Sequence, residues 1–205
     1  MPPTRKERIL ILAKTYPSPS ARYVETSCVA GITQDGAMRR LYPIPFRLIT
    51  DAQQFRKWQW VEVIVEKAPN DHRPESHKVD VGSLVCGERV DTQHGWEARL
   101  QWLAQVPTFD DLDALNQAQT RSQLSLAVLR PTQVLGLEIT KARHADWTEE
   151  EKAKLLQQQT QGQLFDPHEE RRQMVTLRRV PFDFYFHHAC TGPEGVQHHR
   201  SKIID

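Results

Sequence analysis

The sequence predicts a β-rich α+β fold in which two β-rich parts are joined by a helical segment. Short apolar runs rich in β-branched residues fill residues 1–90, helical periodicity replaces them over residues 91–122, and β-prone runs return over residues 123–205. We therefore expect an N-terminal β-domain, a helical bridge and a C-terminal β-domain with one inserted helix, with these boundaries.

The N-terminal part shows the spacing of a small barrel. The run ERILILA, residues 7–13, predicts a buried strand, and Gln34-Asp35-Gly36 between two β-prone stretches predicts a hairpin. In WQWVEVIVEK, residues 58–67, alternate positions carry valines, which places one face in a core. VDVGSLVCGERV, residues 79–90, supplies a further short β segment. Four or five strands in such a short stretch suggest a closed barrel.

Two helices are expected in the middle of the chain. Trp96, Leu100 and Leu103 recur at helical spacing, which predicts that they face inward, and Pro107 ends this helix. The second helix begins near Asp110 or Asp111, whose carboxylates suit a helix N-terminus.

The C-terminal part alternates again between strands and a helix. SLAVLRPTQVLGLEITKA, residues 125–142, predicts two strands separated by Arg130-Pro131. Thr148-Glu149-Glu150-Glu151 is a capping-box pattern that opens a helix, and the glutamine-rich tract 157–163 is typical of a linker. MVTLRRVPFDFYFHHAC, residues 174–190, predicts an aromatic strand.

Composition is that of an ordinary globular chain with an uneven distribution of charge. No apolar run approaches the roughly 18 residues of a membrane span, so we expect a cytoplasmic protein with no membrane partner. The net charge is +1, but residues 1–60 hold ten Lys/Arg against four Asp/Glu, while residues 61–165 hold eleven against sixteen. A basic N-terminal third suits a polyanion, although such imbalances are also common on solvated surfaces.

A histidine-rich segment, FHHACTGPEGVQHH at residues 186–199, raises the question of a metal site. A turn within it brings Cys190, His187 or His188, and His198 or His199 toward one another, and zinc is bound by such ligands. The segment lacks a second cysteine, and neighbouring histidines on a strand face opposite sides. A polar hairpin with surface histidines is the main alternative; otherwise no cofactor is expected.

The order of several landmarks resembles a bacterial family of dual-OB-containing domains. They are Cys28-Val29-Ala30-Gly31, Arg40-Leu41-Tyr42-Pro43, Leu126-Ala127-Val128-Leu129-Arg130-Pro131, Leu164-Phe165, and Pro181-Phe182-Asp183-Phe184-Tyr185-Phe186 running into Cys190. Relatives in that family carry a second cysteine and a histidine after the last landmark, whereas this chain has Glu194 near that position. The resemblance implies two small OB-like β-barrels bridged by a helical segment, acting in a bacterial antiviral-defence or mobile-element complex.

OB-type barrels bind single strands through aromatic side chains and a basic groove. The predicted contacts to nucleic acid interleave the two kinds of residue: Arg39, Arg40, Tyr42, Arg56, Lys57 and Trp58. The alternatives are that most of these aromatics are core residues, or that the surface binds a protein partner. No phosphate-binding loop, nucleophile elbow or metalloprotease motif is present in the sequence. We therefore expect a non-enzymatic nucleic-acid-binding module of modest affinity and, as alternatives, a protein–protein adaptor subunit or a zinc-binding protein centred on Cys190.

Overall fold

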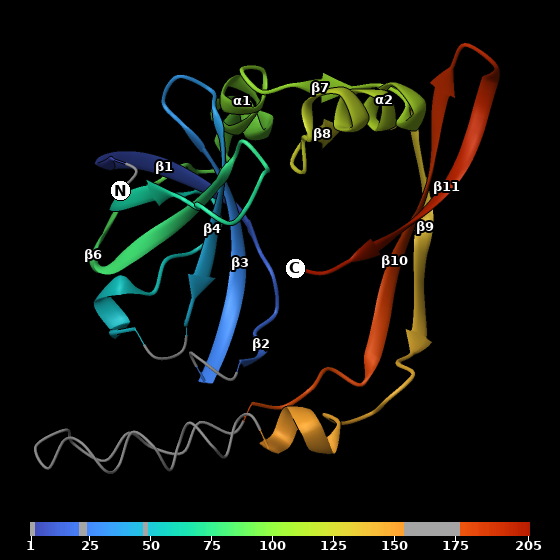
Figure 1. Ribbon diagram of the computed structural model, residues 1–205. Helices are drawn as coiled ribbons and strands as arrows, with labels where there is room; N and C mark the ends of the chain where they lie inside the picture. Colours follow the sequence, from blue (N-terminus) through green and yellow to red (C-terminus); the bar gives the residue numbers. More distant parts are fainter. Residues whose placement is uncertain (1–2, 21–23, 47–48, 154–176) are drawn as a thin grey trace, which may run out of the picture.

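Five strands of the N-terminal half close into a β-barrel (Figure 1). The computed structural model describes residues 3–20, 24–46, 49–153 and 177–205. The barrel strands are β1 (Thr4–Lys14), β3 (Val24–Thr33), β4 (Met38–Ile44), β5 (Gln59–Lys67) and β6 (Ser76–Arg89). Short β2 (Ser18–Ser20) pairs with β3, and the 3₁₀ turn η1 (Asp51–Gln53) lies between β4 and β5.

Strand order gives the barrel its topology. The sequence of neighbours is β1-β5-β6-β4-β3 and back to β1, with every pairing antiparallel except β4–β6. The parallel β4–β6 pairing consists of two residue pairs, so only a short ladder closes the barrel at this point. Numbered among the barrel strands alone, the order is 1-4-5-3-2, which is consistent with the predicted OB-like barrel and makes β3 and β4 the second and third strands.

Alternation along the strands builds two cores. One fills the barrel and includes Ile9, Leu41 and the predicted valines Val61, Val63 and Val65. The other lies outside the barrel wall, where side chains of β1, β3 and β5 pack against the helix that follows β6. Its buried members are Leu10, Ile32, Trp60 and Val106.

Two positions of the barrel favour glycine, one because of its backbone conformation and one because a Cβ would not fit. Gly36 has φ +79° in the turn between β3 and β4, which confirms the hairpin predicted from Asp35-Gly36. Gly31 lies where β3 runs against β1: a Cβ there would lie 2.6 Å from both Ile9 Cγ2 and the Leu10 carbonyl oxygen. Only glycine therefore permits this close pairing without a shift of the wall.

Helix α1 (Gln93–Leu103) covers the outer core, but with a different face from the predicted one. Trp96 and Leu100 are about half exposed, whereas Arg99 is buried and Trp102 packs on Trp60 with ring centroids 4.8 Å apart. The prediction for Trp96 and Leu100 was wrong because His94, Gly95 and Trp96 have positive φ, which turns the chain before the regular helix begins. Leu103 does pack against the outer core.

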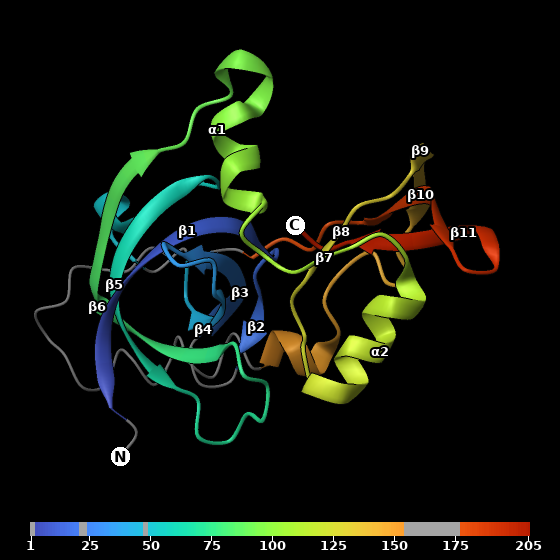
Figure 2. The same cartoon turned by 90° about the horizontal axis from the view of Figure 1, so that it is seen from above.

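Helix α2 (Leu112–Ser122) begins as predicted, because the Asp111 carboxylate caps it by accepting a hydrogen bond of 2.7 Å from the Ala114 amide. Short parallel strands β7 (Thr108–Phe109) and β8 (Val128–Leu129) flank this helix in the sequence. Seen from above, α1 lies beside the barrel and α2 beside the C-terminal sheet (Figure 2).

The described C-terminal residues form an open antiparallel sheet in the order β11-β10-β9, and a second barrel is not confirmed. Its strands are β9 (Gln133–Lys141), β10 (Phe182–Gly192) and β11 (Gly195–Ile203). Residues 149–153 are helical, and the Thr148–Glu151 capping box is confirmed by mutual hydrogen bonds. The glutamine-rich tract 157–163 and the Leu164-Phe165 pair lie outside the described residues.

Candidate nucleic-acid interface

Arg39 and Arg40 face opposite sides of the barrel wall. Arg39 lies on the same side of β4 as Leu41, which points into the barrel, and its guanidinium donates two hydrogen bonds to the Glu7 carboxylate at 2.7 and 2.9 Å. Both side chains are largely buried. Arg39 therefore belongs to the end of the barrel interior, and its predicted contact with nucleic acid does not fit this geometry.

The outward side of β3 and β4 forms a small polar surface, which we call the β3–β4 face: Cys28, Arg40, Tyr42 and, from the β5–β6 loop, Arg73. Tyr42 is 48% exposed. Burial raises the pKa of the Cys28 thiol, and the nearby guanidiniums of Arg40 and Arg73 act in the opposite direction, which places both cations beside this strand.

The β5–β6 loop is held rigidly against the barrel. Lys67, at the end of β5, donates hydrogen bonds from Nζ to the carbonyls of Asp71, Arg73 and Ser76 at 2.9, 2.7 and 3.2 Å. The Arg73 guanidinium binds the Asp71 carboxylate, and this hydrogen bond holds the pKa of Asp71 well below its usual range. Among the described residues, no carboxylate lies within ion-pair distance of Arg40. The face therefore presents one unpaired arginine, one paired arginine and an exposed ring.

Arg56 and Lys57 lie at another place on the barrel. Both are exposed and stand near Lys14, whose pKa is lowered first by burial and further by these two cations. The Lys57 ammonium lies 3.0 Å from the Asp205 carboxylate. This cluster keeps a cationic excess, but no described contact joins it to Arg40 or Tyr42.

Trp58 packs against helix α1. Its ring meets Trp96 edge to face at 6.4 Å, and the Arg99 guanidinium lies over it at 4.8 Å. Trp58 has φ +61°, which directs its side chain toward α1 and away from the outer surface of β4. The alternative considered for these aromatics, a core role, applies to this residue.

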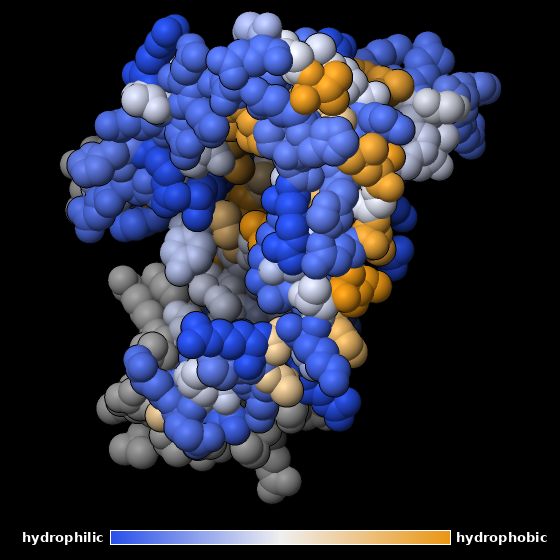
Figure 3. All heavy atoms as spheres, turned by 90° about the vertical axis from the view of Figure 1, so that its right-hand side faces the viewer, coloured by the Kyte–Doolittle hydropathy of each residue, from blue (hydrophilic) through white to orange (hydrophobic). Residues whose placement is uncertain are grey.

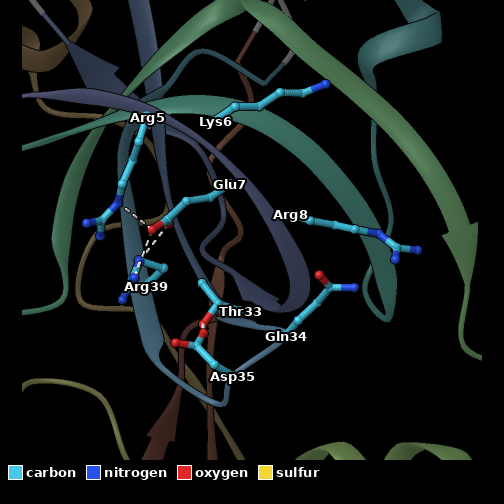
Figure 4. Close-up of a pocket in the computed structure, with 8 residues that line it drawn as sticks. All are labelled: Arg5, Lys6, Glu7, Arg8, Thr33, Gln34, Asp35 and Arg39. Atoms are coloured by element: carbon cyan, nitrogen blue, oxygen red, sulfur yellow. Dashed lines mark hydrogen bonds and ion pairs between the residues drawn. The ribbon is translucent and has the colours of Figure 1, made fainter.

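A surface depression lies at the end of the barrel closed by Glu7 and Arg39 (Figure 4). It is lined by Arg5, Lys6, Glu7, Arg8, Thr33, Gln34, Asp35 and Arg39. Its cations are already bound: Arg5 and Arg39 share Glu7, Lys6 pairs with Glu62, and Arg8 pairs with Glu88. A ligand phosphate would therefore have to displace protein carboxylates there.

The predicted metal ligands are divided between the two faces of the β10–β11 hairpin. Cys190 is buried, but His187 faces the opposite side, where its Nε2 lies 2.5 Å from the Glu138 carboxylate. His198 pairs with Ala189 and is exposed on that same side as His187. His187 and His198 therefore cannot join Cys190 in one site, because neighbouring strand positions alternate between faces.

His188 takes the place beside Cys190. Its Nδ1 lies 3.8 Å from the Cys190 sulfur, its Nε2 lies 2.9 Å from Ser201 Oγ, and its ring centroid is 5.5 Å from that of His199. Burial raises the pKa of the Cys190 thiol and lowers that of His188, which favours the neutral form of each. Within the described ranges, no group of three or more His, Cys, Asp or Glu side chains is arranged to hold a metal ion.

Sequence reasoning missed two cations of the surface, Lys14 and Arg73. Arg73 lies in the loop between β5 and β6, and the pairing of β4 with β6 brings this loop beside β4. Lys14 ends β1 and reaches the Phe46 ring, with its Nζ 3.4 Å from the ring centroid. No local sequence signal places either residue near a predicted contact, because both proximities arise from non-local strand pairing.

The two halves of the chain match different family models. Residues 5–105 match a domain of unknown function (DUF8758), and residues 104–205 match a second domain of unknown function (DUF8757). Each half thus has its own family model. No curated protein and no solved structure matches the chain. The two descriptions name no activity and no partner, so the resemblance to dual-OB-containing domains stays a prediction.

Proposed function

We propose that the barrel is an OB-type module that binds single-stranded nucleic acid on the β3–β4 face, without catalysing a reaction. The observation that carries the proposal is the strand order, which makes β3 and β4 the strands that OB folds use for oligonucleotides, with Arg40 and Tyr42 pointing outward from β4. Tyr42 offers a ring for base stacking, and Arg40 offers a phosphate a guanidinium that no described carboxylate binds.

The charge of the molecule sets the affinity that we expect. With a net charge of +1, and with Arg5, Lys6, Arg8 and Arg39 bound to carboxylates, the described part of the barrel offers few phosphate contacts. Few contacts give weak binding with a shallow dependence on salt. This fits a subunit that acts inside a larger assembly, and the resemblance described above suggests a bacterial antiviral-defence or mobile-element complex.

The test is fluorescence anisotropy of a labelled oligothymidylate and a labelled oligouridylate of about 16 nucleotides, the upper end of site sizes for one OB fold. Removing the ring in Tyr42→Ala should weaken binding by about 1–3 kcal/mol, a rise in Kd of roughly 5- to 150-fold, whereas Tyr42→Phe should preserve it. Arg40→Ala should lower the slope of log K against log salt by about 0.7.

Arg89→Ala is the matched control, because Arg89 is an exposed cation that ends β6, whereas Arg40 pairs with Ser76 at the start of that strand. If the wild-type protein leaves the anisotropy of both oligonucleotides unchanged, the proposal fails. It also fails if Arg40→Ala and Tyr42→Ala bind as Arg89→Ala does.

A protein–protein adaptor is the second candidate, favoured by the apolar side chains that the C-terminal sheet exposes: Val134, Leu135, Leu137, Ile139, Phe182 and Phe186. Soluble chains seldom leave such a group uncovered. A pull-down with and without nuclease separates the two candidates, since a complex that survives nuclease digestion is held by protein contacts.

A further inference from the structure

Strand β9 is an open edge of the C-terminal sheet. In the order β11-β10-β9 it pairs with β10 on one side, and no strand among the described residues pairs with its other side. Leu137 and Ile139 are each 56% exposed, and only Glu138 and Thr140 of its nine residues are half-buried rather than exposed. Alternate N–H and C=O groups of this edge are therefore available to another strand.

β9 has few of the protections of an edge strand, and the pairing with β10 shows one of them, a β-bulge at Leu135 between Val134 and Gly136. Its sequence, QVLGLEITK, contains no proline, and its two charged residues are Glu138 and Lys141. Glu138 does not place a free charge at the edge, because its carboxylate is bound by Arg200 at 2.9 and 3.0 Å and by His187. Lys141 stands at the end of the strand. Natural sheets cover or charge such edges, so β9 has the character of a strand that is paired in its working state.

An apolar surface continues from this edge across the sheet. Leu137 pairs with Phe186 and Ile139 with Phe184, so these side chains share a face, on which Phe182 and Phe186 are nearly half exposed. Figure 3, which views the molecule from the side of this sheet, shows hydrophobic residues gathered in a column along it. A strand added at the β9 edge would widen the sheet and cover part of this apolar face from solvent.

The sequence of β9 is compatible with antiparallel pairing to a second copy of itself, centred on Leu137. With Leu137 opposite Leu137 of a second copy, Gly136 lies opposite Glu138, so the carboxylate meets a residue without a side chain and no like charges face each other. The same register sets Leu135 opposite Ile139, so it also aligns the aliphatic side chains.

We propose that β9 pairs in antiparallel fashion with β9 of a second copy of this chain, about a twofold axis at Leu137. Two three-stranded sheets then become one continuous six-stranded sheet. The contact uses backbone hydrogen bonds of both edges and brings the apolar columns of the two copies together. It is independent of the proposed nucleic-acid function, because β9 lies outside the barrel.

The first test is sedimentation equilibrium of the full chain, freed of nucleic acid by nuclease and high salt, over a range of concentrations. The wild-type protein should associate to a dimer, and Leu137→Lys should be monomeric, because it sets two ammonium groups opposite each other at the axis. Val196→Lys is the matched control, since Val196 is an exposed apolar residue on β11, at the opposite edge. Circular dichroism checks that each variant is folded.

The second test needs no disruptive change. Leu137→Cys should form an intermolecular disulfide under mild oxidation, because residues at the axis face their own copies across the pair. Thr140→Cys, three residues from the axis and therefore distant from its own copy, should not. The wild-type chain, whose cysteines are buried or half-buried, controls for native thiols. A wild-type monomer at every concentration, a dimer that survives in Leu137→Lys, or cross-linking at residue 140 in preference to 137 overturns the proposal.

Discussion

The Glu7–Arg39 pair closes one end of the barrel interior. Both side chains follow the inward-facing positions of their strands, and the Arg39 guanidinium offers its two-pronged geometry to the Glu7 carboxylate. Burial acts to raise the pKa of Glu7, but the hydrogen bond and charge of Arg39 outweigh it and lower that pKa. The pair therefore replaces apolar packing where the barrel meets water.

Arg39→Ala should cost about 2–4 kcal/mol of unfolding free energy, because it leaves a largely buried carboxylate without its main partner. Urea denaturation followed by tryptophan fluorescence measures this. Arg5→Ala, which removes a more exposed partner of the same carboxylate, should cost below about 1 kcal/mol. Equal losses in the two variants would contradict the structural role assigned to Arg39.

Helix α1 shows how an element can be positioned by aromatic contacts rather than by an aliphatic stripe. Arg99 is buried between the rings of Trp58 and Trp96, at 4.8 and 4.9 Å, and donates hydrogen bonds to the Val90 carbonyl. Trp102 completes the contact by packing edge to face on Trp60. The helix is therefore fixed to the wall by one side, and Leu100 is left in solvent.

Trp102→Ala should destabilise the protein by about 3 kcal/mol, since it removes a large ring from the outer core. Leu100→Ala, in the same helix but 55% exposed, should change stability by less than about 0.5 kcal/mol. Thermal unfolding of the two variants distinguishes the observed helix face from the one predicted by periodicity. A greater loss in Leu100→Ala would reverse the assignment.

The C-terminal sheet should weaken in acid through Glu138. Hydrogen bonds from Arg200 and then His187 lower the pKa of Glu138 to about 2. A lowered carboxyl pKa contributes stability that is present above the ordinary pKa of about 4.5 and is lost as pH falls toward 2. The difference in unfolding midpoint between wild-type protein and Glu138→Gln should therefore shrink over this window. A constant difference from pH 6 to about 2 would contradict the assignment.

At the scale of the whole molecule, a few polar contacts join the two halves. The Tyr16 amide donates to the Ile204 carbonyl at 3.2 Å, Lys57 pairs with Asp205, and the buried Glu75 carboxylate accepts hydrogen bonds from both the amide and the hydroxyl of Ser125. Among the described helices, none is long and apolar enough to cross a membrane. Among the described residues, these hydrogen bonds and this ion pair join the halves, together with the packing of Val128 on the outer core.

Glu75→Ala should loosen this connection, because it removes the buried acceptor of both Ser125 hydrogen bonds. We expect urea unfolding to change from one transition to two, seen as different midpoints for tryptophan fluorescence and far-UV circular dichroism. Glu97→Ala, an exposed carboxylate on α1, should leave the two signals coincident. Separate transitions already present in the wild-type protein would show that Glu75 is not the link.

Sequence patterns predicted correctly the turn, strand and cap features that depend on a few consecutive residues. The Asp35-Gly36 hairpin, the alternating valines of β5, the Asp111 cap and the Thr148 capping box were all predicted and are confirmed. Each depends on the backbone geometry or hydrogen bonds of a few consecutive residues. The predicted site residues are not all brought together: neighbouring positions on a strand face opposite sides, so Arg39 and Arg40 lie on different faces, as do His187 and Cys190.

By itself, the amino-acid sequence determined the kinds of element, their order and a small N-terminal barrel, because period and turn chemistry are properties of short segments. Only the tertiary structure decided which cations remain available, which histidine lies beside Cys190 and which strand is left as an open edge. These outcomes depend on which distant strands pair and in what register, and that choice is made by the burial of the whole chain rather than by any local pattern.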